Sequence, residues 1–236
     1  HAADRAVIID NVLLPLCNQI TPHLHNKNLT VIVIPFGETV DIRQLGAQYL
    51  NYENLLNQAK GDWQPVILDE NSPAAMCYTS GTTGRPKGVV YSHRSILLHA
   101  VTAGLRDYLG IGRYDVVLPV VPMFHVNAWG IPFVAALLGT KLVLPGPHLD
   151  AVSLLDLMQS ERVNLAAGVP TLWMGLLNAL NQHPTQWDLV KPMTLIVGGS
   201  ATPTNLMHGL DAHGLKLVCA WGMTEVSPLG SIARLD

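Results

Sequence analysis

Short apolar runs alternate with helical patterns along most of the chain. Residues 30–34 read Thr-Val-Ile-Val-Ile, which is apolar on both faces, as in strands buried inside parallel sheets. Residues 151–160 repeat apolar side chains at helical spacing, directly after Asp150, a favourable N-cap residue. Strands are predicted at residues 6–9, 30–34, 73–77, 89–91, 115–121, 141–144, 163–167, 195–197 and 215–220. Helices are predicted at residues 11–24, from residue 52 onward, and at 92–105, 124–138, 151–160, 170–180 and 204–213.

This alternation predicts an α/β protein with mostly parallel sheets flanked by helices. Connections of a few residues favour parallel strands joined by right-handed crossovers. A polar connector at residues 69–72 predicts a boundary between an N-terminal α/β portion, residues 1–72, and a second α/β portion, residues 73–236. Ligands of open parallel sheets bind beyond the carboxyl ends of the strands. The glycine-rich and polar motifs fall at such ends, so we expect the functional site there.

Composition narrows the functional class. The chain has 236 residues, 49% hydrophobic and 13% charged, which suffices for a substantial core. A net charge of −3 predicts neither a nucleic-acid partner nor binding to an anionic membrane. Three cysteines in apolar contexts predict free thiols in a reducing, cytoplasmic compartment. No apolar run predicts a transmembrane helix, and the chain begins with His1 rather than Met, so we expect a piece of a longer protein.

The most informative stretch is residues 78–88, Tyr-Thr-Ser-Gly-Thr-Thr-Gly-Arg-Pro-Lys-Gly. It places four Ser/Thr hydroxyls, three glycines and one lysine between two predicted strands. Glycines let backbone N–H groups surround phosphate oxygens, and Lys87 adds a compact positive charge. The spacing differs from a Walker A loop, which needs Gly-Lys-Ser/Thr followed by a helix. A flexible surface hairpin is the alternative, but it leaves Lys87, which follows the rigid Pro86, without a role.

Three further motifs follow predicted strands. Residues 122–130 carry His125 and Trp129 at the expected start of a helix, whose free N–H groups favour a carboxylate. Residues 197–201, Val-Gly-Gly-Ser-Ala, form a small-residue turn between a strand and a helix. Residues 221–225, Trp-Gly-Met-Thr-Glu, offer a flat indole for a purine, a hydroxyl for phosphate and a carboxylate for Mg²⁺. On chemistry alone, each motif has an alternative without a functional role. These are a packed helix start for residues 122–130, a tight turn for residues 197–201 and a solvated turn for residues 221–225.

The loop at residues 78–88 resembles the phosphate-binding signature of the acyl-adenylate-forming (AMP-binding) superfamily. The sequences of residues 125–129 and 144–150 resemble those of bacterial medium- and long-chain fatty-acyl-CoA synthetases and methylthiopropionate ligases. His125 stands where amino-acid-activating members usually have Asp, which argues against an amino-acid substrate. The resemblance implies part of a large domain with layered αβαβα architecture. It also implies that the ribose-binding Asp, the hinge and a small C-terminal domain with its catalytic Lys lie outside this chain.

The resemblance implies a two-step reaction. A carboxylate attacks the α-phosphate of ATP to give acyl-AMP and pyrophosphate, and the thiol of coenzyme A then displaces AMP. The expected cofactors and partners are ATP, Mg²⁺, CoA and a carboxylic acid, with a fatty acid preferred. An aryl or methylthioalkanoate substrate, a non-catalytic nucleotide-binding homologue and a homodimer remain open alternatives. The chain by itself is expected to be inactive, because the C-terminal lysine is missing from it.

The resemblance also assigns roles to individual residues. The catalytic residues would be Lys87, His125, Thr224 and Glu225. The nucleotide would contact Thr79, Ser80, Gly81, Thr82, Thr83, Gly84, Lys87, Gly199, Ser200, Ala201, Trp221, Gly222, Met223 and Thr224. The acid would contact His125, Val126, Asn127 and Trp129, with Trp129 as the gate of an acyl tunnel. Mg²⁺ would bind Thr79 and Glu225. Trp221 departs from the tyrosine usual in the family, and Cys219 from its glutamine.

Overall fold

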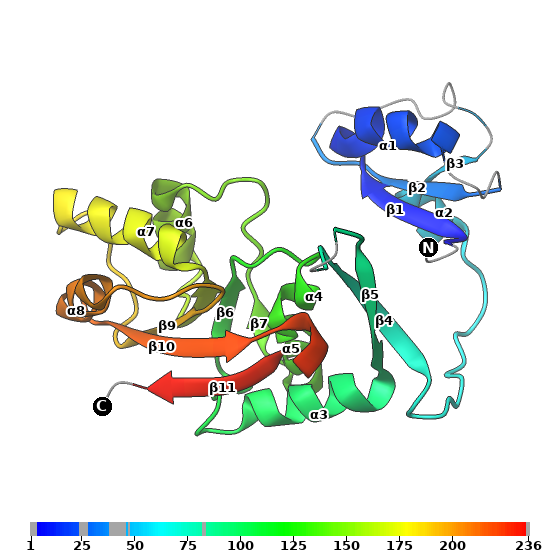
Figure 1. Cartoon of the computed structure of the whole chain (residues 1–236). Coiled ribbons are helices and arrows are strands. Elements are labelled where there is room, and N and C mark those ends of the chain that lie inside the picture. The colour runs from blue at the N-terminus through cyan, green and yellow to red at the C-terminus, as the bar shows by residue number, and fades with distance from the viewer. Residues whose placement is uncertain (1–3, 24–27, 38–45, 47, 82–83, 235–236) are drawn as a thin grey trace. The chain divides into compact units, whose positions relative to one another are not determined.

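The computed structural model describes residues 4–23, 28–37, 46, 48–81 and 84–234 (Figure 1). The chain divides into two compact units, residues 1–67 and residues 68–236. The sequence-based boundary at residues 72–73 stays a prediction. In the part of the chain just given, no helix is both long and apolar enough to cross a bilayer.

The first unit is a small parallel sheet with short helices. Its elements are β1 (Ala6–Asp10), α1 (Leu14–Ile20), β2 (Thr30–Ile34), β3 (Tyr49–Asn51) and α2 (Tyr52–Gln58). The strands pair in the order β1-β2-β3. Val31 and Val33 of β2 are buried while the alternate residues are half-buried, so one face is buried as predicted and the other is less buried than the apolar sequence predicts. The helix predicted at residues 11–24 is α-helical only over Leu14–Ile20, with short 3₁₀ turns on either side at Asn11–Leu13 and Thr21–His23.

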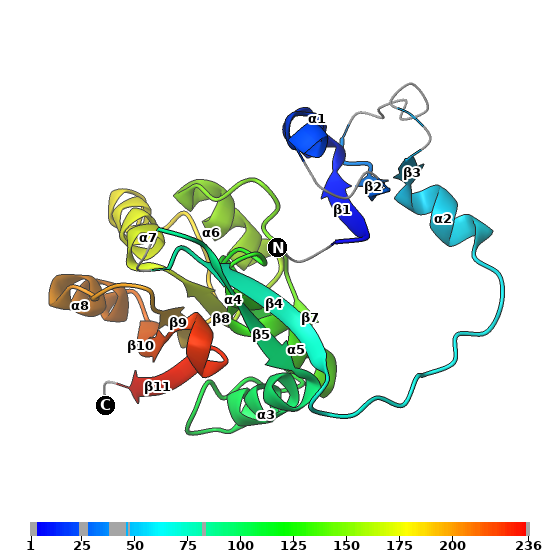
Figure 2. The same cartoon turned by 45° about the vertical axis from the view of Figure 1, so that its right-hand side comes forward.

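The second unit contains a six-stranded sheet of order β11-β10-β9-β8-β6-β7 and a separate hairpin of β4 and β5 (Figures 1 and 2). The strands are β4 (Pro73–Thr79), β5 (Lys87–Ser92), β6 (Val116–Pro119), β7 (Lys141–Leu142), β8 (Leu165–Gly168), β9 (Met193–Val197), β10 (Leu215–Gly222) and β11 (Leu229–Arg234). The helices are α3 (His93–Gly104), α4 (Val126–Trp129), α5 (Ile131–Leu138), α6 (Ala151–Ser160), α7 (Pro170–Gln182) and α8 (Thr204–Ala212). The predicted α/β class with mostly parallel sheets is confirmed.

Alternate residues of the central strands enter two separate cores. Leu195 and Val197 of β9 pack with side chains of α6, α7 and α8, whereas Ile196 packs on the opposite face with α3 and α5. This two-sided burial explains the nearly continuous apolar runs of these strands. Trp173 of α7 is fully buried, and its indole N–H donates to the carbonyl of Ile196 at 3.2 Å. The sheet is therefore a rigid platform for the loops at its carboxyl end.

Helix starts follow the predicted capping chemistry. The hydroxyl of Ser92 accepts from the N–H of Ser95 at 3.1 Å and caps α3. The carboxylate of Asp150 accepts from the N–H of Ser153 at 3.0 Å and caps α6, as expected for an N-cap. Hydrogen bonding by Ser153, first from its backbone N–H and then from its side chain, holds the pKa of Asp150 below its ordinary value. Pro170 is the first residue of α7, where its missing N–H costs nothing.

Residues 126–130 differ from the prediction. The apolar pattern predicts one helix over residues 124–138, but Val126, Asn127, Ala128 and Trp129 have φ of 49–56° and Gly130 has φ of 72°. The segment α4 is therefore a left-handed turn, and the right-handed α5 begins at Ile131. The predicted helix N-terminus at His125 is wrong, because right-handed helical N–H groups do not follow it. Such a turn is unfavourable for L-residues and must be held by contacts from outside the segment.

The end of the chain also differs from the prediction. The sequence patterns predict no strand after residue 220, yet β10 extends to Gly222, and β11 returns antiparallel beside it. The reversal passes through a one-turn 3₁₀ helix, Thr224–Val226. It brings residues 228–229 back against the end of β10, since the N–H of Met223 donates to the carbonyl of Pro228 at 2.9 Å.

Candidate functional site

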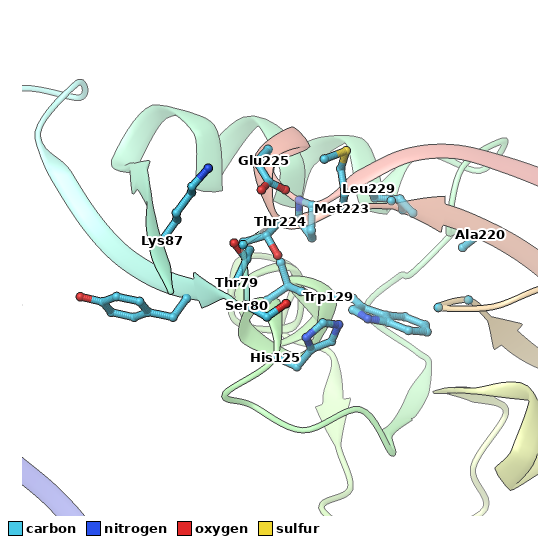
Figure 3. Close-up of a pocket in the computed structure, with 17 residues that line it drawn as sticks. Thr79, Ser80, Lys87, His125, Trp129, Ala220, Met223, Thr224, Glu225 and Leu229 are labelled. Atoms are coloured by element: carbon cyan, nitrogen blue, oxygen red, sulfur yellow. The ribbon is translucent and has the colours of Figure 1, made fainter. Parts of the chain in front are cut away.

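A cavity of about 660 Å³ lies in the second unit, where β6, β9 and β10 end (Figure 3). Its lining residues come from five segments: residues 78–81, Lys87, and parts of residues 125–129, 198–199 and 220–229. This is the carboxyl end of the parallel strands, where the sequence predicts the site. Figure 3 shows that Thr79, Thr224 and Glu225 form one group, with Lys87 on one side and Trp129 on the other.

The β4–β5 hairpin positions the described residues of the predicted phosphate-binding loop, residues 78–88, called the phosphate loop below. Its antiparallel register pairs Thr79 with Lys87 at the end of the hairpin where the loop connects the two strands. Gly81 has φ of 65°, and a Cβ atom there would stand 2.5 Å from the carbonyl oxygen of Arg85. Only glycine fits where the loop folds back so closely. The exposed ammonium of Lys87 and the hydroxyls of Thr79 and Ser80 are therefore presented to the same cavity.

The 3₁₀ turn at Thr224–Val226 brings a carboxylate to the phosphate-loop side of the cavity. Thr224 is buried and Glu225 is exposed, so the turn is anchored at its first residue and leaves the carboxylate free to bind. The hydroxyl of Tyr91 on β5 donates to the backbone carbonyl of Thr224 at 2.6 Å. Burial, followed by the nearby Cys77 and Glu225, raises the pKa of Tyr91, which therefore keeps its proton and remains a donor.

The left-handed turn presents three side chains to the cavity and turns a fourth away. His125, Val126 and Trp129 line the cavity. The side-chain oxygen of Asn127 instead accepts from the thiol of Cys77 at 3.6 Å. Its side-chain nitrogen is buried and has no hydrogen-bond partner among the described residues. Asn127 therefore lines a separate, much smaller cavity rather than the main one.

His99 of α3 closes this smaller cavity from behind the turn. A Cβ atom at Gly130 would stand 2.5 Å from both Cε1 and Nδ1 of the His99 ring. The His99 side chain is 9% exposed, and burial lowers the pKa of this imidazole. Its Nε2 atom has no hydrogen-bond partner in the described part of the chain. The ring therefore acts as a neutral packing surface against the backbone of Gly130.

A second cavity of about 470 Å³ adjoins the first and shares Gly199, Ala220 and Gly222 with it. Trp221 lines this second cavity, and its indole lies against the backbone of Gly230 on β11. The residues of the small turn after β9 that line the second cavity are Gly199, Ser200, Ala201 and Thr202. The main cavity carries Lys87 and Glu225, and the adjoining cavity carries the indole of Trp221.

Most of the predicted site residues meet in these cavities. The main cavity collects Thr79, Ser80, Gly81, Lys87, His125, Val126, Trp129, Gly199, Gly222, Met223, Thr224 and Glu225. Ser200, Ala201 and Trp221 line the adjoining cavity. Gly84 is exposed and lines neither cavity, and Asn127 lines only the small one. Thr82 and Thr83 lie outside the described residues.

Five lining residues received no role from the sequence: Tyr78, Gly198, Ala220, Pro228 and Leu229. Tyr78, Gly198 and Ala220 adjoin or belong to the quoted motifs, so proximity to a motif was the available signal. Pro228 and Leu229 had no such signal, because they reach the cavity only through the antiparallel return of β11.

The donor set fits Mg²⁺ held together with phosphates. Thr79 and Glu225 line one cavity from different segments of the chain, and both side chains end in hard oxygen atoms of the kind that Mg²⁺ prefers. Among the described residues, no cluster of three or more His, Cys, Asp or Glu side chains forms a metal cage. Mg²⁺ commonly binds one or two carboxylates and completes its shell with water and substrate phosphates, so these two residues are compatible with that mode.

Comparisons with known proteins identify relatives of this chain. The chain is 43% identical over 232 residues to a medium-chain-fatty-acid–CoA ligase of Ectopseudomonas oleovorans, and the match covers 98% of the chain and 42% of that protein. It is 44% identical to a 3-methylmercaptopropionyl-CoA ligase of Ruegeria pomeroyi, with the same coverage of 98% and 42%. The chain thus spans less than half the length of either relative.

Solved structures show the same fold. A benzoate CoA ligase from Burkholderia xenovorans superposes with a TM-score of 0.81 at 20% identity, over 99% of this chain and 44% of that one. The family model described as AMP-binding enzyme matches residues 2–236, which is nearly the whole chain. The chain therefore belongs to the AMP-binding enzyme family.

Proposed function

We propose that the whole protein activates a carboxylic acid with ATP and transfers the acyl group to the thiol of coenzyme A. One observation carries this proposal. A single cavity collects the loop residues Thr79 to Gly81, the cation of Lys87, the carboxylate of Glu225 and the turn that holds His125 and Trp129. Phosphate-binding, metal-binding and acid-binding groups are thereby within reach of one another, as attack of a carboxylate on a phosphate requires.

The nucleotide would span the two adjoining cavities. Loop N–H groups, the hydroxyl of Ser80 and Lys87 would hold the β- and γ-phosphates, where developing charge is stabilised by preorganised donors. The purine would occupy the second cavity between the small turn at residues 199–201 and the indole of Trp221. Thr79 and Glu225 would hold Mg²⁺, which when bound neutralises charge on the phosphoryl oxygens.

The acid would lie beside the left-handed turn. Val126, Trp129 and Leu229 give this side of the cavity an apolar lining, and His125 is the polar group at its edge. An apolar lining with one such group favours a hydrophobic carboxylic acid. We propose a fatty acid, supported by the medium-chain relative at 43% identity. A methylthioalkanoate is the second candidate, supported by the relative named for 3-methylmercaptopropionate at 44% identity.

The complete reaction is assigned to the whole polypeptide that carries this chain. The chain spans 42% of the length of the two relatives. We therefore propose that the 236-residue chain by itself does not complete acyl transfer. A cytoplasmic location and a homodimer stay predictions.

The test is a product survey with the whole polypeptide. Purified protein is mixed with ATP, Mg²⁺, CoA and one acid from a panel of straight-chain fatty acids, benzoate and 3-methylthiopropionate. We expect acid-dependent pyrophosphate release and a thioester, identified by mass spectrometry, for the fatty acids. A preference for 3-methylthiopropionate would move the substrate assignment to the second candidate. ATP binding without pyrophosphate release from any acid would contradict the enzymatic function and indicate a nucleotide-binding homologue.

A further inference from the structure

Tyr91 links two parts of the candidate site from outside the cavity. It lies on β5, its side chain is 4% exposed, and its hydroxyl donates to the carbonyl of Thr224 at 2.6 Å across 133 residues of sequence. The ring packs in a buried cluster with Cys77 and Val126. Tyr91 does not line the main cavity, so it reaches the site only through the groups that it contacts.

The accepting carbonyl belongs to the peptide that carries Glu225. Because a peptide unit is planar, the direction of the Thr224 carbonyl also sets the N and Cα positions of Glu225. The turn has little internal support, since a single 3₁₀ turn forms few hydrogen bonds of its own. The other hydrogen bond to this carbonyl, from the N–H of Ser227, is long at 3.4 Å. The hydrogen bond from the Tyr91 hydroxyl is thus the shorter of the two that this carbonyl accepts.

The same strand carries the phosphate-loop lysine. Lys87, Val89 and Tyr91 alternate along β5, so their side chains share one face of the strand. Lys87 pairs in register with Thr79 on β4, which is the predicted Mg²⁺ ligand on the hairpin side. One hairpin therefore positions Thr79 and Lys87 directly, and Glu225 through the hydroxyl of Tyr91.

We propose that Tyr91 is a positioning residue for Mg²⁺ binding. Its hydroxyl holds the Thr224–Glu225 peptide against the β4–β5 hairpin, and so sets the separation across which Thr79 and Glu225 bind one ion with the phosphates of ATP. This inference rests on the proposed function, because it needs Mg²⁺ and ATP in the main cavity. It adds a residue that touches neither the ion nor the nucleotide.

The test is the Mg²⁺ dependence of ATP binding by the whole polypeptide, measured by calorimetric titration. Tyr91→Phe keeps the ring and its packing and removes only the hydroxyl. We expect this variant to need roughly tenfold more Mg²⁺ for half-maximal ATP binding, the lower end of the loss seen when an outer partner of a metal ligand is removed. ATP binding without Mg²⁺ should be unchanged.

Tyr108→Phe is the matched control. Its hydroxyl also donates to a distant backbone carbonyl at 2.9 Å, that of Leu229, which belongs to β11 and not to the turn that carries Glu225. We expect both variants to lower the melting temperature by similar amounts and only Tyr91→Phe to change the Mg²⁺ requirement. Equal Mg²⁺ requirements in the two variants would show that Tyr91 supports the fold alone, and would overturn the proposal.

A double-mutant cycle tests whether Tyr91 acts through Glu225. If it does, Tyr91→Phe should add little to the Mg²⁺ defect of Glu225→Gln, because the carboxylate that it positions is already gone. Fully additive defects would overturn the proposal. A wild-type protein that binds no ATP at any Mg²⁺ concentration would overturn the proposed function as well. A wild type that binds ATP with the same Mg²⁺ dependence as Tyr91→Phe would overturn the positioning role alone.

Discussion

The indole of Trp129 lies against Gly198, at the junction of the left-handed turn and the turn after β9. A Cβ atom at Gly198 would stand 3.2 Å from Cη2 of Trp129 and 2.9 Å from the carbonyl oxygen of Ala220. The absence of a side chain at Gly198 therefore lets the indole lie in the main cavity as it does.

Gly198→Ala should displace the Trp129 indole. The added methyl group has the backbone of β10 on one side, so the indole is the part that moves. Overpacking of this kind costs about 1–3 kcal/mol of unfolding free energy. We expect the KM for the acid to change more than the KM for ATP, because Trp129 lines the side of the cavity that we propose for the acid. Gly175→Ala in α7 is the control, since its methyl group meets only the Ala151 side chain at an ordinary 3.8 Å. A larger effect on ATP than on the acid would contradict the assignment.

Trp129→Ala tests the predicted gate of the acyl pocket. Removing the indole enlarges the cavity on the side shared with Val126 and Leu229. We expect the whole polypeptide to shift its preference toward longer or bulkier acids, measured as kcat/KM across straight-chain acids. One methylene group in an apolar pocket is worth about 1–3 kcal/mol of discrimination, so a shift of the preferred acid by even one carbon is measurable. An unchanged length profile would remove the gate from the proposal.

Gly130→Ala should destabilise the protein strongly. Gly130 has φ of 72°, and a methyl group there would stand 2.5 Å from the His99 ring. Gly139→Ala is a matched control, because Gly139 has φ of 71° and nothing within 4 Å of its Cβ position. Both variants incur the left-handed penalty of about 1–2 kcal/mol, and Gly130→Ala adds about 1–3 kcal/mol of overpacking. Urea unfolding of both gives the difference, and equal losses would show that the His99 ring yields freely.

Stability should fall in mild acid because of His99. Burial lowers the pKa of this imidazole, so below about pH 6.5 the unfolded chain binds a proton that the folded chain does not. The stability that the protein gains from keeping His99 neutral is complete above that pH and decreases as the pH falls through it. Tyr91 is the other ionisable side chain that lines the same small cavity.

The measurement is the urea midpoint at about pH 7.5 and about pH 5.5 for wild type and His99→Gln. We expect His99→Gln to reduce the loss of stability between the two conditions. Removing the exposed His93 from the same helix, by His93→Gln, provides the baseline for loss of one imidazole. An acid-induced loss as large in His99→Gln as in wild type would contradict this assignment.

Lys87→Ala should impair turnover rather than folding. Lys87 is exposed and lines the main cavity, and we expect its loss to cost about 3 kcal/mol of transition-state stabilisation, as for removal of a preorganised donor. Lys141→Ala is the control, because the ammonium of Lys141 forms an exposed ion pair with Glu161 at 2.7 Å and does not line the main cavity. Such a surface pair contributes roughly 0–1 kcal/mol to stability. Wild-type kcat/KM in Lys87→Ala would remove the residue from the mechanism.

Much of the fold followed from local patterns. The parallel strands of the large sheet and the starts of α3, α6 and α7 lie where the apolar periodicity and the capping residues predict them. The phosphate loop was also recognisable, because its hydroxyls, glycines and lysine are consecutive in the chain. Asn127 shows the limit of this approach. Its place in a quoted motif predicts a substrate contact, but the turn directs its side chain to Cys77 and away from the main cavity.

The sequence by itself determined the order of most strands and helices, the predicted phosphate-binding loop and the family, because these depend on neighbouring residues and on turn chemistry. The tertiary structure decided how the segments meet. The left-handed turn at residues 126–130 opposes the intrinsic preference of L-residues, so it exists only through contacts such as those of Cys77 and Gly198. The return of β11 and the hydrogen bond from Tyr91 to Thr224 join residues far apart in the chain. No local spacing encodes such contacts, because packing selects them only when the whole sheet has formed.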